Sequence, residues 1–319
     1  HPALDKACEY FGLTLTKLPA RSSDQRMDPE SVRSALSSRT IMVYASAPTF
    51  PHGVIDPIED IAAVCREAGV GLHVDNCLGG ILLSAMQLGG VEVPAFDFRV
   101  EGVESVSMDL HKYGQCSKGV SVVCFSSQEL RRHAYCTVTD WPGGLYVTHT
   151  SQGSRSGAIM AVAWATLLRH GKKGYVSMAL KVHTMVQALA EAIRATPGLR
   201  LLTQPDACIV SFTSDDFSIY QLVDRFKKDH GRTANALQRP AGAHICVSER
   251  MEADFDQLVK DLKATAAACL EEGSAAAAGG GTAGIYGSSA TLPPAAIDSV
   301  LRKYPDIVLT VKKKEGAGE

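Results

Sequence analysis

The alternation of apolar runs with amphipathic stretches in the first 125 residues constrains the fold most strongly. Residues 56–69 have the helical pattern, with Pro57 near the start and Gly69 at the end. Nearly continuous apolar strands separated by helices are typical of a parallel sheet that is buried on both faces. We therefore predict an α/β large domain over residues 1–172. Its expected strands are the apolar runs 40–46, 70–75, 104–109 and 119–125.

The second half of the chain has a different pattern. A long connecting helix is expected over residues 173–196, and alternating strands and helices over 197–319 predict a smaller α+β domain. The apolar run 158–168 is shorter than the roughly 20 residues of a membrane span and is expected to be a buried helix. Residues 273–289, rich in Gly, Ala and Ser, predict an irregular crossing, and the tail 312–319 is expected to be disordered.

Composition excludes several classes of function. With a net charge of -2, the chain has no excess of basic residues for binding a nucleic-acid backbone. The nine cysteines include no CxxC pair and no zinc-ligand spacing, so no metal site is expected. Their odd number, without a secretory signal, is typical of a reducing compartment. Because the chain begins with His1 rather than Met, we expect a fragment or a processed product.

Two polar residues follow predicted strands at the edge where open α/β sheets bind ligands. Asp75 ends one strand, and Lys112 follows another, beside His111. A lysine amine attacks aldehydes when burial or neighbouring cations suppress its charge, and Lys118 would add a further cation to the loop. An aspartate can keep a pyridine nitrogen protonated. Together they match the needs of a pyridoxal phosphate enzyme, although each alone also fits a solvated lysine or a helix-capping aspartate.

An ordered series of motifs extends over most of the chain: "PTFPHGVIDP", "LHVDNCLGG", "FDFRVEGVESVSMDLHKYG", "SKGVSVV", "TDWPGGLY" and "GSRSGA". This series resembles the sphingosine-1-phosphate lyase family. The resemblance implies a pyridoxal phosphate enzyme of the aspartate-aminotransferase type (fold type I), a group II decarboxylase-like lyase. It would cleave a phosphorylated sphingoid base (sphinganine or sphingosine 1-phosphate) to a fatty aldehyde and phosphoethanolamine, in sphingolipid catabolism.

The same resemblance implies roles for the cofactor-site residues. Lys112 would form the Schiff base with pyridoxal 5'-phosphate, and Asp75 would pair with its pyridine nitrogen. His1 would stack over the ring, and His111 would hold the cofactor or take part in catalysis. The ordinary alternatives are a frayed terminal residue for His1 and a loop histidine bonded to backbone for His111.

Three further residues complete the implied site. Lys118 and His52 are expected at the substrate phosphate, and Arg155 is expected to bind the cofactor from a segment that reaches the neighbouring subunit's site. A surface lysine, a turn histidine and a helix-start arginine are the ordinary alternatives. Departures from the family pattern are Leu110, where a hydroxyl residue is usual, and "QCSKG", where the family has "YAPKG".

The resemblance also implies surroundings for the protein. A homodimer, a long-chain amino alcohol phosphate as substrate and the cytosolic side of the endoplasmic reticulum membrane are expected. The glycine-rich cofactor-phosphate loop, the substrate-entry residues and the membrane anchor are expected before His1, outside this chain.

Two alternatives stay open. A pyridoxal phosphate-dependent amino-acid decarboxylase of the same fold would use the same Lys112 and Asp75, although the residues after both favour the lyase. A non-catalytic scaffold that has lost cofactor binding would need neither residue.

Overall fold

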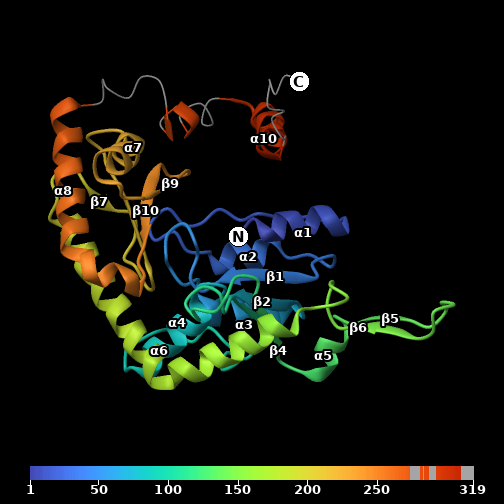
Figure 1. Cartoon of the computed structure of the whole chain (residues 1–319). Coiled ribbons are helices and arrows are strands. Elements are labelled where there is room, and N and C mark those ends of the chain that lie inside the picture. Colours follow the sequence, from blue (N-terminus) through green and yellow to red (C-terminus); the bar gives the residue numbers. More distant parts are fainter. Residues whose placement is uncertain (274–280, 283, 287–291, 310–319) are drawn as a thin grey trace, which may run out of the picture.

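The computed structural model describes residues 1–273, 281–282, 284–286 and 292–309. Its first sheet has the strand order β1-β2-β3-β4 (Figure 1). Strands β1, β2 and β3 are parallel, as predicted, but β4 is antiparallel to β3. The physical reason is that residues 109–121 form turns and no helix that could carry the chain across a face of the sheet. The strands are β1 (Met42–Ser46), β2 (Gly71–Asp75), β3 (Val103–Met108) and β4 (Val122–Phe125).

The two faces of this sheet differ in polarity, because successive strand residues point to opposite sides. Ala45, Leu72 and Val106 belong to the apolar core, together with side chains of the helices α3 (Ile58–Ala68) and α4 (Gly79–Leu88). Alternate residues toward the carboxyl ends of the same strands are polar and include Asp75. Helix α3 ends as predicted at Gly69, whose φ of 67° lies in the left-handed region that favours glycine.

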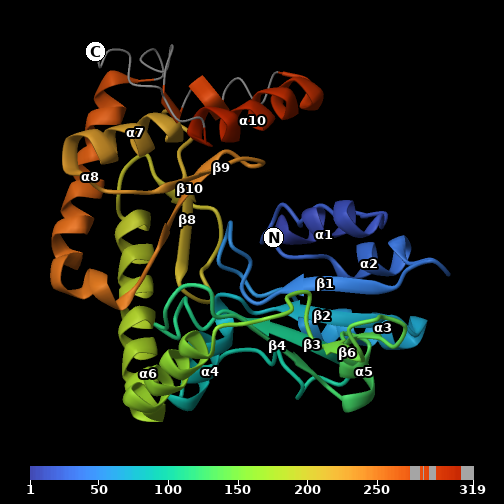
Figure 2. The ribbon, with the colours of Figure 1, turned by 45° about the vertical axis from the view of Figure 1, so that its right-hand side comes forward.

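A second, antiparallel sheet has the strand order β7-β8-β10-β9 (Figure 2). One helix, α7, packs on this sheet and a second, α8, packs on α7, which confirms the predicted alternation of strands and helices in this half of the chain. The strands are β7 (Arg200–Leu201), β8 (Ile209–Thr213), β9 (Asn235–Leu237) and β10 (Gly242–Cys246). The helices are α7 (Ile219–His230) and α8 (Phe255–Glu272), the latter preceded by the 3-10 helix η1 (Glu249–Asp254).

Helix α6 (Gly157–Arg194) links the regions of the two sheets and has a kink at Gly171. The predicted helix over 173–196 corresponds to the part after the kink, which is buried along one side against α4 and the second sheet. The prediction that 158–168 is buried is wrong. Trp164 and Leu168 are 67% and 61% exposed, because no described element covers that side of the helix.

The remaining elements lie around these sheets, and strands β5 and β6 form a hairpin that projects from the body (Figure 1). No described helix is long and apolar enough to cross a membrane. The predicted crossing 273–289 lies mostly, and the tail 312–319 wholly, outside the described residues. The division into domains stays a prediction. These elements are α1 (Ala3–Phe11), α2 (Pro29–Ala35), α5 (Gln128–Arg132), β5 (Cys136–Val138), β6 (Tyr146–Thr148) and α10 (Pro294–Leu309).

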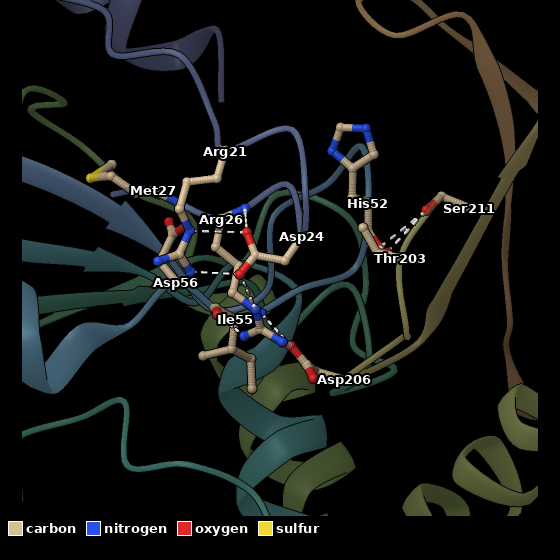
Figure 3. Close-up of polar contacts among 10 residues, drawn as sticks. All are labelled: Arg21, Asp24, Arg26, Met27, His52, Ile55, Asp56, Thr203, Asp206 and Ser211. Atoms are coloured by element: carbon tan, nitrogen blue, oxygen red, sulfur yellow. Dashed lines mark hydrogen bonds and ion pairs between the residues drawn. The ribbon is translucent and has the colours of Figure 1, made fainter. Parts of the chain in front are cut away.

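The carboxylates of Asp56 and Asp206 connect the loop after β1 to other parts of the chain by hydrogen bonds and an ion pair (Figure 3). Asp206, from the loop before β8, accepts hydrogen bonds at 2.7 Å from the Ile55 backbone N–H and from the Arg26 guanidinium. Asp56 accepts from the backbone N–H groups of Met27 and Ser46, both at 2.9 Å. The loop is therefore held between an N-terminal segment and the second sheet.

Replacing Asp206 by Ala should lower the free energy of unfolding by about 1–3 kcal/mol, because the buried Ile55 N–H would lose its acceptor. The Arg26 guanidinium would lose one partner and keep Asp24 and the Ile55 carbonyl. The urea midpoint measures this loss. Asp215→Ala is the matched control, since its ion pair with Arg200 is exposed and should shift the midpoint little. Equal shifts in the two variants would contradict the account.

Candidate active site

Asp75 lies at the carboxyl end of β2 and is only 5% exposed. Its Oδ1 accepts hydrogen bonds from the Cys77 backbone N–H at 2.9 Å and the Ser107 hydroxyl at 3.3 Å. Its Oδ2 accepts from the Tyr44 hydroxyl at 2.8 Å. Burial alone would raise the pKa of Asp75, but these donors outweigh burial and hold the pKa below its usual range. Asp75 is therefore a buried, ionised carboxylate.

Lys112 lies in the turn after β3, and its side chain is 27% exposed. Its Nζ forms an ion pair with Asp109 Oδ2 at 2.9 Å and lies near the Cys77 thiol. Burial lowers the pKa of the Lys112 ammonium, but these two partners more than offset it and the pKa is raised. The expectation that neighbouring cations suppress the charge of Lys112 is wrong, because the groups that contact it are a carboxylate and a thiol.

Tertiary contacts fix the turn that carries Lys112. The Tyr113 hydroxyl donates to the Val247 carbonyl at 2.6 Å, beside the second sheet. The Tyr175 hydroxyl of α6 donates to the Gly114 carbonyl at 2.8 Å. Gly114 is required here, since an added Cβ would lie 2.5 Å from a backbone oxygen of the same turn. Contacts from α6 and from beside the second sheet thus set the position of Lys112.

Cys77 joins the two predicted residues. Its backbone N–H donates to Asp75, and its thiol lies near both Lys112 and Asp75. Burial, as the largest cause, raises the pKa of Cys77, so the thiol stays protonated at neutral pH. The structure therefore brings Asp75 and Lys112 together, as predicted, on the two sides of a residue that had no assigned role.

His111 is held by backbone. Its ring Nδ1 lies 2.6 Å from the carbonyl oxygen of Val120, an acceptor that requires the proton on Nδ1. Its Nε2 is then free of a proton in the neutral ring and lies 3.7 Å from Asp109 Oδ2. The backbone contact named as the ordinary alternative is present, and it leaves Nε2 as an acceptor.

The two other predicted histidines differ in burial. His1 is exposed just before α1. His52 is buried, and its ring points away from Thr203 and Ser211, whose hydroxyls contact its backbone carbonyl (Figure 3). Burial and the nearby His244 lower the pKa of His52 to about 4, so its ring is neutral at neutral pH.

Lys118 and Arg155 are not brought to this cluster. Lys118 is exposed and forms no ion pair with any described residue. Arg155 is exposed and contacts His149 and Thr150, within its own segment between β6 and α6. Their predicted roles remain predictions.

The two departures from the family pattern pack together. Leu110 and Cys116 are buried with Ala163 in a small apolar cluster under the first part of α6. This apolar contact accounts for a leucine at a position where a hydroxyl residue was expected. No group of acidic, His and Cys residues in the described part of the chain could hold a metal ion.

The donor set fits a cofactor with a basic ring nitrogen and an aldehyde. Asp75 supplies an ionised carboxylate and Lys112 an amine, with Cys77 between them. Next to Asp75, the side-chain nitrogen and oxygen of Asn76 are buried without a partner among the described residues. Such atoms normally have partners, so they favour a polar ligand at this edge of the sheet.

Comparison with known proteins places these residues in a family. The profile described as pyridoxal-dependent decarboxylase conserved domain matches residues 1–215. The sphingosine-1-phosphate lyase of Dictyostelium discoideum is 36% identical over 97% of this chain and 58% of its own length. That of Arabidopsis thaliana is 38% identical over 92% of this chain and 53% of its own. The chain thus spans about half the length of the curated relatives it matches.

Solved structures confirm the predicted fold class. A sphingosine-1-phosphate lyase of Burkholderia pseudomallei has a TM-score of 0.87 and 34% identity, over 98% of this chain and 66% of that one. Glutamate decarboxylase of Lactobacillus brevis, at 20% identity over 85% of this chain and 65% of that one, shares the fold with a TM-score of 0.74. The chain belongs to the pyridoxal-dependent decarboxylase family, with sphingosine-1-phosphate lyases among its relatives at about 35% identity.

Proposed function

We propose that the protein is a pyridoxal phosphate-dependent lyase that cleaves a phosphorylated sphingoid base to a fatty aldehyde and phosphoethanolamine. The observation that carries the proposal is the cluster of Asp75, Cys77 and Lys112 at the carboxyl ends of β2 and β3. Its support is the 36–38% identity to sphingosine-1-phosphate lyases over nearly the whole chain. A location at the endoplasmic reticulum membrane belongs to the same proposal.

Each residue of the cluster has a task that follows from its contacts. When bound, pyridoxal phosphate supplies an aldehyde for a lysine amine and a ring that accepts electrons. Lys112 would hold the aldehyde carbon, and Asp75 would hold the ring nitrogen. Because Lys112 must lose a proton before it can attack an aldehyde, Asp109, at 2.9 Å, is placed to accept that proton.

Cleavage of the substrate needs a base for its C3 hydroxyl. The hydrogen bond to Val120 keeps the His111 proton on Nδ1 and leaves Nε2 able to accept one. The Lys112 amine, whenever it is not bonded to the cofactor, would offer a second base in the same loop. We propose that these two residues share the proton transfers at the C3 hydroxyl and at the carbon left after cleavage.

The substrate phosphate would meet two different groups. Lys118 is exposed and would supply a positive charge. His52 is neutral at neutral pH because burial lowers its pKa to about 4, so it would supply a single N–H donor rather than a cation. This division of roles makes Lys118 the source of the electrostatic attraction.

The site is proposed to be completed by a second copy of the chain. Apolar side chains crowd the β5–β6 hairpin and the first part of α6, and exposed apolar clusters of this kind mark protein interfaces. Arg155 lies between these two elements, where a homodimer could bring it to the partner's cofactor. The side chains are Trp141, Leu145, Val147, Trp164 and Leu168, all between 55% and 85% exposed.

The first test separates the lyase from a decarboxylase and from a scaffold. The purified protein with pyridoxal phosphate should convert a phosphorylated sphingoid base to fatty aldehyde and phosphoethanolamine, and should release no carbon dioxide from glutamate. Lys112→Ala should lose at least about a thousandfold in rate, since it removes the nucleophile and a base together. Lys172→Ala, which removes an exposed lysine of α6, should keep full activity.

Carbon dioxide without aldehyde would favour the decarboxylase instead. A folded protein that binds cofactor but gives neither product would contradict a catalytic role.

The second test addresses the dimer. Sedimentation velocity at micromolar concentration should show a dimer for the unmodified chain and a monomer for Leu145→Asp combined with Trp164→Asp, because a buried unpaired charge opposes association. Leu88→Asp places a charge at a comparably exposed leucine at the end of α4 and should leave the dimer intact. A dimer that survives the double substitution would refute this interface.

A further inference from the structure

The polar face of the first sheet carries a connected network around Asp75. Tyr44 of β1, His73 of β2 and Ser105 of β3 are aligned across the strands, and Asp75 is aligned with Ser107 in the same way. Since strand residues two apart share a face, all five side chains lie on the side opposite the apolar core. None of the other four residues had a role in the predicted site.

The network holds Tyr44 in place. The Tyr44 ring stacks on the His73 ring, with centroids 5.0 Å apart and planes 30° apart. The two His73 nitrogens contact the hydroxyls of Ser105 at 2.8 Å and Ser107 at 3.2 Å. His73 is therefore fixed by two serines, and it fixes Tyr44 in turn.

The two oxygens of Asp75 are used unequally. Oδ1 receives two donors, the Cys77 N–H and the Ser107 hydroxyl. Among the described residues, Oδ2 receives the Tyr44 hydroxyl at 2.8 Å, and the Cys77 thiol lies close to the carboxylate. A carboxylate oxygen accepts two hydrogen bonds, so Oδ2 has room for one more donor, and Tyr44 determines the direction in which that site points.

We propose that Tyr44 is a positioning residue of the cofactor site, which orients Asp75 Oδ2 for the protonated ring nitrogen of pyridoxal phosphate and keeps this carboxylate ionised. The inference rests on the proposed function and adds a residue to it. Tyr44 acts through Asp75.

The groups around Asp75 explain why the neutral Tyr44 hydroxyl is important for its ionisation. The carboxylate forms no ion pair with any residue in the described part of the chain. His73, beside it on β2, is neutral because burial lowers its pKa. The other groups near it are the Cys77 thiol and the Lys112 and Asp109 pair of the following turn.

Ionisation of Asp75 therefore depends on its hydrogen-bond donors. Burial and the Asp75 charge both raise the pKa of Tyr44, so its hydroxyl keeps its proton and is a donor at every working pH. Loss of this donor should raise the Asp75 pKa. As the pH falls, Asp75 would then take up its proton at a higher pH than in the unmodified protein. Its attraction for a protonated ring nitrogen would be lost at that higher pH as well.

The test compares Tyr44→Phe with Tyr220→Phe, which also removes one hydroxyl, from a bond to the Leu237 carbonyl in the second sheet. Carbon-detected NMR of aspartate carboxyls gives the Asp75 pKa in the protein without cofactor. The visible absorbance of bound pyridoxal phosphate gives its affinity between pH 5 and 8. In Tyr44→Phe the carboxyl pKa should rise, and affinity should fall about tenfold near pH 5 but less than about threefold at pH 8.

Each other outcome overturns the proposal in a recognisable way. An equal loss of affinity at every pH would make Tyr44 merely structural, and so would an equal effect of Tyr220→Phe. If Tyr44→Phe bound the cofactor with an unchanged Asp75 pKa and an unchanged pH dependence of affinity, the role of Tyr44 would be overturned. The proposed function would then still stand. If the unmodified protein bound no pyridoxal phosphate at any pH, the proposed function would fail and the role of Tyr44 with it.

Discussion

The buried charge of Asp75 is the constraint on which the site depends. Burial penalises a carboxylate severely unless it is hydrogen-bonded or paired, and here three donors stand in for a counter-ion. A buried carboxylate lowers the stability of the fold and has no use in a scaffold, but it can bind a cationic ring nitrogen. The sheet places Asp75 at its carboxyl edge, and the Cys77 that follows links it to Lys112. The proposed chemistry therefore depends on the carboxylate at the end of β2.

The second sheet matters to this site although it supplies none of the cluster. Tyr113 ties the Lys112 turn to Val247, and Asp206 ties the loop that carries His52 to the start of β8. A change in how the two sheets meet would move the amine of Lys112 relative to Asp75. Rigid placement of reacting groups accounts for a large part of catalysis, which gives these contacts a functional as well as a structural meaning.

The sequence pattern predicted which residues lie at the carboxyl ends of the parallel strands. Asp75 and Lys112 could be placed at one edge of the sheet from the sequence, because parallel strands align their carboxyl ends, whatever the exact pairing. Tyr44 and Asp109 were missed, because their contacts depend on register and on the shape of a turn, which periodicity does not contain. The direction of β4 and the exposure of Trp164 were predicted wrongly, since neither the route of a short connection nor the absence of a covering element can be read from an apolar run.

In the proposed function, Lys112 is the residue that holds the cofactor covalently. Borohydride reduction makes a lysine–pyridoxal linkage permanent, so the mass of each proteolytic peptide then shows where the linkage formed. We expect the added pyridoxyl mass on the peptide that contains Lys112, and none in the Lys112→Ala variant. The added mass on Lys118 or Lys172 instead, or on no peptide of the folded protein, would contradict the account.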